Sequence, residues 1–207
     1  MGLSFLALGD SYTIGEGVGE SERWPEQAVR VLRAAGLEFD EPHVIARTGW
    51  TTDELAAAIA EAGIERTFDL VSLLIGVNNQ YRSRPLDEYR AQFGSLLQTA
   101  VKFADGRPDH VIVVSIPDWG VTPFAKGRDR EVIGREIDAF NAVNWEIAER
   151  AGAMWVDVTG ISRKAEDRPE LMAGDGLHPS GEMYGLWAEA VAPVVRRCLG
   201  VRQRPAQ

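Results

Sequence analysis

The chain has 207 residues, of which 45% are hydrophobic and 26% charged, and its formal net charge is −9 at pH 7. This size and composition are typical of one soluble globular domain with a sizeable core, which we expect to span residues 1–200, followed by a loose C-terminal tail at 201–207. The acidic balance, without any run of Lys or Arg, disfavours nucleic acids and anionic membrane surfaces as partners.

Short apolar runs alternate along the chain with longer amphipathic runs. The apolar runs predict strands at Leu3–Leu8, His43–Ala46, Leu70–Ile75, His110–Ile116 and Met154–Val158. The amphipathic runs predict helices over residues 22–35, 55–62, 85–101 and 130–151, and a last helix after a capping Ser180 that Pro193 should kink. Near-continuous apolar strands that alternate with helices are typical of a doubly wound α/β fold with a parallel sheet.

Targeting and membrane signals are weak in this sequence. The N-terminal apolar run is too short for the core of a signal peptide, and no basic residue precedes it. No stretch approaches the roughly 20 apolar residues of a membrane span. We therefore expect a cytoplasmic location and no stable membrane insertion. The single cysteine, Cys198, excludes an internal disulfide.

Polar residues follow several expected strands. Gly9-Asp10-Ser11 comes after the first, a stretch with Gly49 after the second, and Gly76-Val77-Asn78 after the third, while Asp175-Gly176-Leu177-His178 lies beyond the fifth. Ligands of such sheets bind outside the carboxyl ends of the strands. A strand order of 2-1-3-4-5 would place the first three of these segments around one crevice.

A serine hydrolase is the leading interpretation of these residues. A serine needs a base to take its proton and a third group to orient that base. The chain has three histidines, and His178 lies three residues after an acid, Asp175. His43 also follows an acid, Asp40, by three residues, but it begins a strand at the end opposite the site. We predict Ser11 as the nucleophile, His178 as the base and Asp175 as its partner. The backbone N–H groups of Ser11 and Gly49 and the side-chain amide of Asn78 are the expected oxyanion donors.

These segments, taken in order, resemble the blocks of the GDSL, or SGNH, hydrolase superfamily of esterases and lipases. The resemblance implies a three-layer, flavodoxin-like α/β/α fold with a five-stranded parallel sheet. It also implies metal-free hydrolysis of acyl esters, with no cofactor, by a triad of Ser11, Asp175 and His178. Two positions depart from the usual pattern, because Tyr12 stands where Leu or Ile is common and Asn79 where Asp is common. Either Asn78 or Asn79 could face the oxyanion, and the Gly-x-Asn spacing favours Asn78.

Several other residues are secondary candidates. Candidate substrate-lining residues are Asp10, Tyr12, Trp50, Asn79 and Trp119. His43 and His110 begin strands and so belong to the end opposite the site. Arg47, Tyr81 and Arg82 lie near the crevice, where an arginine could bind a substrate anion, although solvated surface charge is the simpler interpretation. The long loops 117–129 and 161–174 are expected to set selectivity.

A small-molecule ester with a short to medium acyl group is the expected substrate. A carbohydrate O-deacetylase, a lysophospholipase and a thioesterase would use the same triad. A metal-dependent phosphoesterase fits less well, because two-metal sites draw on several His and carboxylate ligands. A non-catalytic binding module on the same scaffold is the remaining alternative, since a fold does not fix a function.

Overall fold

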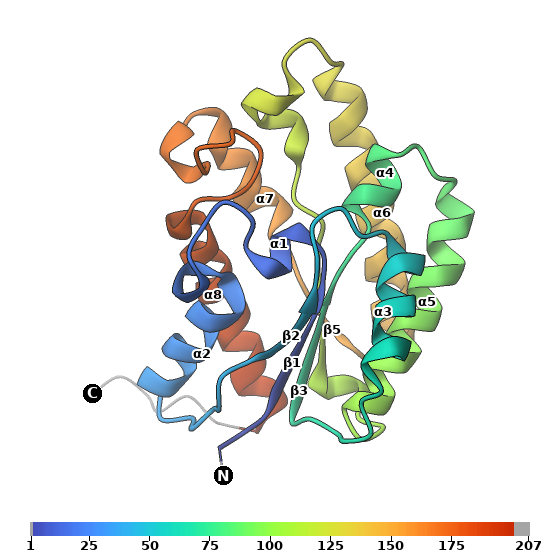
Figure 1. The fold of residues 1–207 in the computed structure, drawn as a ribbon, viewed down its shortest axis with the longest axis vertical. Helices are drawn as coiled ribbons and strands as arrows, with labels where there is room; N and C mark the ends of the chain where they lie inside the picture. Colours follow the sequence, from blue (N-terminus) through green and yellow to red (C-terminus); the bar gives the residue numbers. More distant parts are fainter. Residues whose placement is uncertain (1, 201–207) are drawn as a thin grey trace.

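A parallel β-sheet forms the centre of the computed structural model, which describes residues 2–200. The sheet has five strands in the order β2-β1-β3-β4-β5, so the predicted fold class and strand order are confirmed (Figure 1). The strands are β1 (Phe5–Gly9), β2 (His43–Ala46), β3 (Leu70–Leu74), β4 (Val111–Val114) and β5 (Met154–Val156). The expected loose tail at 201–207 lies outside the described residues.

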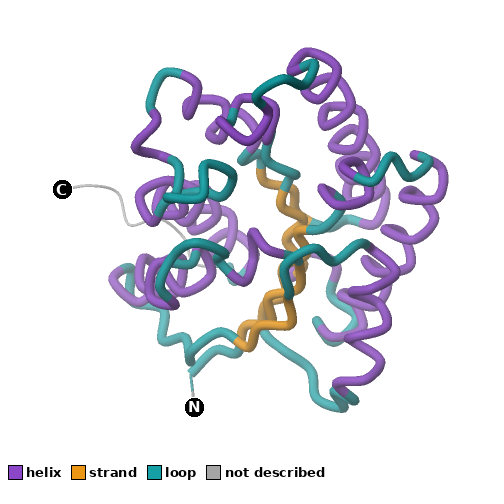
Figure 2. Tube along the Cα trace, turned by 45° about the horizontal axis from the view of Figure 1, so that its top comes forward, coloured by secondary structure: helices purple, strands orange, loops and turns teal. Residues whose placement is uncertain are grey.

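Helices cover both faces of the sheet and make the molecule a three-layer sandwich (Figures 1 and 2). One face carries α1 (Ser11–Ile14), α2 (Trp24–Ala34), α7 (Thr159–Ser162) and α8 (Gly181–Cys198). The other face carries α3 (Thr52–Ala62), α4 (Val77–Tyr81), α5 (Leu86–Phe103) and α6 (Arg130–Ala151). The remaining helical turns are η1 (Glu20–Glu22), η2 (Pro108–His110), η3 (Trp119–Val121), η4 (Pro123–Ala125), η5 (Arg163–Glu166) and η6 (Pro169–Leu171).

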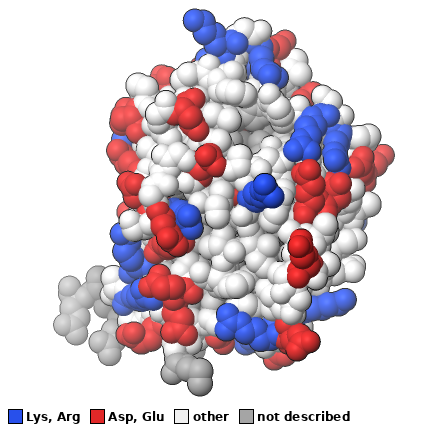
Figure 3. Space-filling model, viewed as in Figure 1, with Lys and Arg blue, Asp and Glu red and all other residues white. Residues whose placement is uncertain are grey.

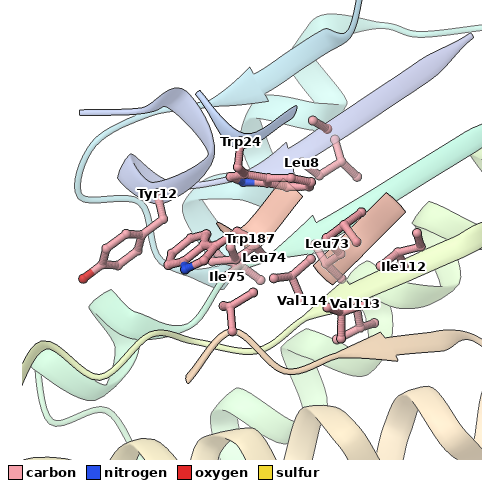
Figure 4. Packing of buried hydrophobic residues seen from close by; sticks show 14 of the residues in the cluster. Leu8, Tyr12, Trp24, Leu73, Leu74, Ile75, Ile112, Val113, Val114 and Trp187 are labelled. Atoms are coloured by element: carbon pink, nitrogen blue, oxygen red, sulfur yellow. The ribbon is translucent and has the colours of Figure 1, made fainter. Parts of the chain in front are cut away.

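The core lies between the sheet and these helices. Every residue of β1 and β3 is buried, because both faces of these central strands are covered. Trp24 of α2 and Trp187 of α8 are fully buried on the α2–α8 side of the sheet (Figure 4). Trp24 packs against Phe5 of β1 with ring centroids 6.2 Å apart. The strands are therefore held rigidly from both sides, which fixes the positions of the loops that follow them.

Local signals set the limits of the long helices. A capping box joins Thr51 and Glu54 at the start of α3, and Asp129 accepts a hydrogen bond from the Val132 N–H at the start of α6. Ser180 caps α8. Pro193 lies inside α8, so the proline does not end this helix.

Two short helices that the sequence pattern did not predict begin where β1 and β3 end. Asp10 caps α1 by accepting a hydrogen bond from the Tyr12 N–H at 3.1 Å. Gly76 precedes α4 with a φ of +132°, and a Cβ atom there would lie 2.5 Å from the ring of Tyr89. Glycine is therefore required at this turn. Both helices lie at the carboxyl edge of the sheet, and they carry Ser11 and Asn78.

Candidate active site

One cavity brings together the predicted catalytic residues Ser11, Gly49, Asn78 and His178. Its volume is about 170 Å³. It lies at the carboxyl edge of the sheet, and Figure 2 is turned to bring this end forward. The other lining residues are Tyr12, Thr48, Val77, Tyr81, Trp119, Phe124 and Leu177. The surface around the hollow in Figure 3 is mostly uncharged, and only a few isolated acidic and basic side chains lie near the middle of that face.

Asp175 holds the imidazole of His178 from outside the cavity. The Nδ1 atom of His178 lies 2.6 Å from Oδ2 of Asp175. The other carboxylate oxygen, Oδ1, accepts the backbone N–H groups of Leu177 and His178, both at 2.9 Å. When the neutral ring carries its proton on Nδ1 and donates it in a hydrogen bond to Asp175, Nε2 is unprotonated and can accept a proton.

The Asp175 carboxylate is held in its charged form. Partial burial acts to raise the pKa of Asp175, but the hydrogen bonds from the ring and N–H of His178 and from the N–H of Leu177 outweigh it. The pKa of Asp175 therefore lies below its usual value. An ionised Asp175 suits an orienting role, because it can stabilise the imidazolium that forms when His178 takes a proton.

The two neighbouring asparagines have different surroundings. The Nδ2 group of Asn78 donates to the carbonyl of Trp50 at 2.9 Å, and its second N–H remains for the cavity that Asn78 lines. Asn79 is fully buried, accepts the Thr52 N–H at 3.1 Å and donates to the Thr52 hydroxyl at 2.7 Å. Asn79 thus connects α4 to the start of α3. Of the two, this geometry favours Asn78 as the oxyanion donor.

Gly49 lies in a tight turn at the edge of the cavity. Its φ is +86°, a left-handed conformation that side chains disfavour. The Trp50 N–H closes the turn on the carbonyl of Arg47 at 3.3 Å. A turn of this kind exposes the backbone of Gly49 to a ligand without any side chain in the way.

Three of the candidate substrate-lining residues do not line this cavity. Asp10 is fully buried beneath Ser11 because it caps α1, and Asn79 is buried against Thr52. Trp50 packs, partly buried, against the hydrophobic core. Tyr12 and Trp119 do line the cavity, as predicted. The Tyr12 ring lies between those of His178 and Trp187, at centroid distances of 5.5 and 6.1 Å; Figure 4 shows it beside Trp187.

An aromatic wall completes the cavity, and of its three residues the sequence interpretation missed only Phe124. Tyr81, Trp119 and Phe124 contact one another, with ring centroids 5.4 to 6.1 Å apart. Trp119 is buried, and its indole N–H donates to the Gln80 side chain at 2.7 Å, whereas Tyr81 and Phe124 are 41% and 42% exposed. The length of loop 117–129 was the one sequence signal for Phe124.

The buried Asp10 predicts an unusual pH dependence of stability. Burial raises the pKa of Asp10 from 3.8 to about 7, against the opposing hydrogen bond from Tyr12. The folded protein then binds this proton more tightly than the unfolded chain, so stability falls as the pH rises from about 4 to about 7. Asp10→Asn keeps an oxygen for the Tyr12 N–H and never ionises. We expect the thermal unfolding midpoint of Asp10→Asn, relative to that of the wild type, to rise between pH 5 and pH 8.

Other titrating groups, including Glu26, whose pKa burial also raises, are common to both proteins and cancel in this difference. Unfolding midpoints of the two proteins that change in parallel with pH would show that Asp10 is ionised throughout.

Comparison with known proteins supplies the family. The model of the GDSL-like lipase/acylhydrolase family matches residues 7–186. The chain belongs to this family. The hydrolase is 28% identical over 201 residues to an acetylxylan esterase of Geobacillus stearothermophilus, covering 90% of this chain and 81% of the relative. It is 26% identical over 197 residues to a GDSL lipase of Mycobacterium tuberculosis, covering 91% and 79%. The structure of TesA superposes with a TM-score of 0.73 at 20% identity, covering 94% of this chain and 99% of TesA, a likeness in fold.

Membership makes this GDSL hydrolase an esterase that acts on carboxylic esters. Within residues 2–200, no helix combines the length and apolar character needed to cross a membrane. His43 begins β2, as predicted, whereas His110 is the last residue of η2 and directly precedes β4. His110 Nδ1 bonds the Asp69 carbonyl at 2.7 Å, and His43 stacks on Phe68.

Proposed function

We propose that the hydrolase cleaves esters through Ser11, His178 and Asp175. Ser11 Oγ attacks the carbonyl carbon of the ester while Nε2 of His178 takes its proton. The imidazolium then gives the proton to the leaving alcohol, which leaves an acyl group on Ser11. Water, deprotonated by His178, releases the acid and restores the serine. The placement of Ser11 and His178 on one cavity, with the ring held by Asp175 at 2.6 Å, is the observation that carries this proposal.

The negative oxygen that forms during both steps needs donors already in place. The N–H of Ser11 lies at the start of α1, where backbone N–H groups are free and the helix dipole favours negative charge. Gly49 offers a backbone N–H from its turn, and Asn78 a side-chain N–H from α4. These donors are neutral and come from rigid elements, so little reorganisation is needed as charge develops.

The size and lining of the cavity support a short acyl group. Its volume of about 170 Å³ lies below the roughly 300 Å³ at which pockets for drug-sized ligands begin. Phe124, Leu177 and Val77 make much of the lining apolar. We infer acetyl and similarly short esters as the preferred substrates.

A series of p-nitrophenyl esters tests this preference. We expect kcat/KM to be highest for acetate to butyrate and to fall at least about 10-fold by octanoate, because each excluded methylene forfeits roughly 0.8 kcal/mol of burial. Phe124→Ala should open the aromatic wall and raise the octanoate-to-acetate ratio about 3-fold or more. Trp145→Ala serves as the control, because Trp145 is a similarly exposed aromatic residue (46%) outside the cavity lining. A wild-type optimum at octanoate would refute the short-acyl inference.

A carbohydrate O-deacetylase is the second candidate, and one feature of the cavity favours it. Tyr81 and Phe124 present exposed rings beside the cavity, and such rings offer flat apolar faces on which a sugar ring can pack. The likeness to an acetylxylan esterase agrees with this reading. Acetate release from acetylated xylo-oligosaccharides at a kcat/KM above that for p-nitrophenyl acetate would establish it. Release below that value would leave the general esterase.

A further inference from the structure

The side chain of Arg82 reaches from the end of α4 to the turn that contains Gly49. Its Nη2 donates to the carbonyl of Gly49 at 2.7 Å, and a Cβ atom built on Gly49 would lie 3.7 Å from the same nitrogen. The guanidinium therefore binds the carbonyl of this glycine and lies on the side where a side chain would project. The interpretation of Arg82 as solvated surface charge is thus incomplete, although its side chain is 42% exposed.

A second contact anchors the guanidinium. Nη1 of Arg82 lies 3.3 Å from the carboxylate of Glu54 on α3. Glu54 is itself fixed, because its Oε2 accepts the backbone N–H of Thr51 at 2.8 Å and the Thr51 hydroxyl at 2.9 Å. These hydrogen bonds, first that from the Thr51 N–H, hold the pKa of Glu54 below its usual value. Arg82 is thus held between an ionised group at the start of α3 and the glycine turn.

Asn78 of α4 and Arg82, the residue that follows α4, bind two consecutive carbonyl groups of the turn that contains Gly49. Arg82 holds the carbonyl of Gly49, and Asn78 holds the carbonyl of Trp50. The backbone N–H of Arg82 also bonds the carbonyl of Asn78 at 3.0 Å, so the two side chains share one short rigid element. One element therefore sets the positions of two proposed oxyanion donors, the Gly49 N–H and the Asn78 amide.

We propose that Arg82 is a positioning residue of the oxyanion hole, an inference that rests on the proposed function. Gly49 has the greatest backbone freedom of the residues in its turn, since it has no Cβ and adopts a φ of +86°. Its N–H is useful only when it points at the developing oxyanion. The hydrogen bond from Arg82 to the Gly49 carbonyl fixes the peptide that follows and restrains the orientation of the glycine. Arg82 itself lies outside the cavity lining and contacts the residue that carries the donor, so it would act through Gly49.

Arg82→Met and Arg82→Lys test this role against Arg84→Met. Arg84 is a matched control, because it comes from the same segment and binds Asp53 of α3 at 2.6 Å. Within residues 2–200, however, its side chain forms no hydrogen bond with the glycine turn. For Arg82→Met we expect kcat for p-nitrophenyl acetate to fall about 10-fold or more with KM within about twofold, because a displaced oxyanion donor weakens only the transition state. Arg82→Lys, which keeps a cationic donor, should recover part of the loss. Arg84→Met should keep both constants.

An inhibitor that mimics the tetrahedral intermediate provides a second readout. The inhibition constant of a short alkylboronic acid should rise for Arg82→Met by a factor similar to the fall in kcat/KM, as expected for a transition-state analogue. The concentration of folded enzyme is measured by titration with a fluorophosphonate, and kcat is calculated from it. Partial unfolding of a variant therefore does not lower its kcat. A kcat of Arg82→Met within twofold of the wild type would overturn the inference, as would equal losses in Arg84→Met. Wild-type turnover in Ser11→Ala would instead refute the proposed function.

Discussion

Replacing Ser11 with alanine should lower kcat for p-nitrophenyl acetate by at least about 10³-fold. The substitution removes the single oxygen that attacks the ester and leaves the cavity, the His178–Asp175 pair and the backbone donors in place. Residual hydrolysis should come from those donors and from substrate binding alone. Because alanine fills nearly the same space at this buried position, the thermal midpoint should stay close to that of the wild type. Steady-state kinetics and a thermal melt measure both quantities.

Ser95→Ala is a suitable control for this experiment. Ser95 lies exposed on α5, where its hydroxyl bonds the carbonyl of Ala91 within the same helix. Its replacement should leave kcat unchanged. Equal rates in Ser11→Ala and the wild type would mean that another residue is the nucleophile.

Substitutions at the two asparagines should have different effects, at Asn78 on catalysis and at Asn79 on stability. Asn78→Ala is expected to lower kcat by about 10² to 10³, the usual loss when one oxyanion donor is removed. Asn79→Ala instead removes two buried hydrogen bonds to Thr52, at 3.1 and 2.7 Å, and should lower the free energy of unfolding by about 1–3 kcal/mol. Its effect on kcat per folded molecule should be much smaller.

Chemical denaturation and kinetics on both variants check this division. The reverse pattern, with Asn79→Ala losing turnover at full stability and Asn78→Ala retaining it, would assign the oxyanion to Asn79. Substitution by aspartate at 79 is an informative companion, because it keeps an acceptor for the Thr52 N–H but loses the amide donor to the Thr52 hydroxyl.

Most of the fold could be predicted from the sequence, because the pattern of apolar residues within each strand and each long helix extends over many residues. The buried strands form continuous apolar runs, and the long helices have helical spacing of apolar residues and recognisable caps such as Thr51 and Ser180. The short helices α1 and α4, of 4 and 5 residues, escaped prediction because they complete too little of a turn pattern to show a periodic face. Those two helices position Ser11 and Asn78.

The site was only partly predictable, for a different reason. Small residues with special chemistry, such as Ser11 and Gly49, follow strands and so could be located by the topology of a parallel sheet. Which of Asn78 and Asn79 lines the cavity depends on where α4 begins, which the sequence pattern left open. The contact of Arg82 with Gly49 depends on the path of two loops after different strands. Neither loop carries a periodic signal, so this arginine looked like any other exposed charge.

Covalent labelling identifies the nucleophile directly. The wild type is treated with a fluorophosphonate, digested, and mapped by tandem mass spectrometry, with His178→Ala treated in parallel. We expect one phosphonyl group per molecule, carried by Ser11, with loss of esterase activity in proportion to labelling and far slower labelling in His178→Ala. Inactivation with the group on another residue, or equally rapid labelling of Ser11 without His178, would contradict the assignment of Ser11 as a nucleophile activated by His178.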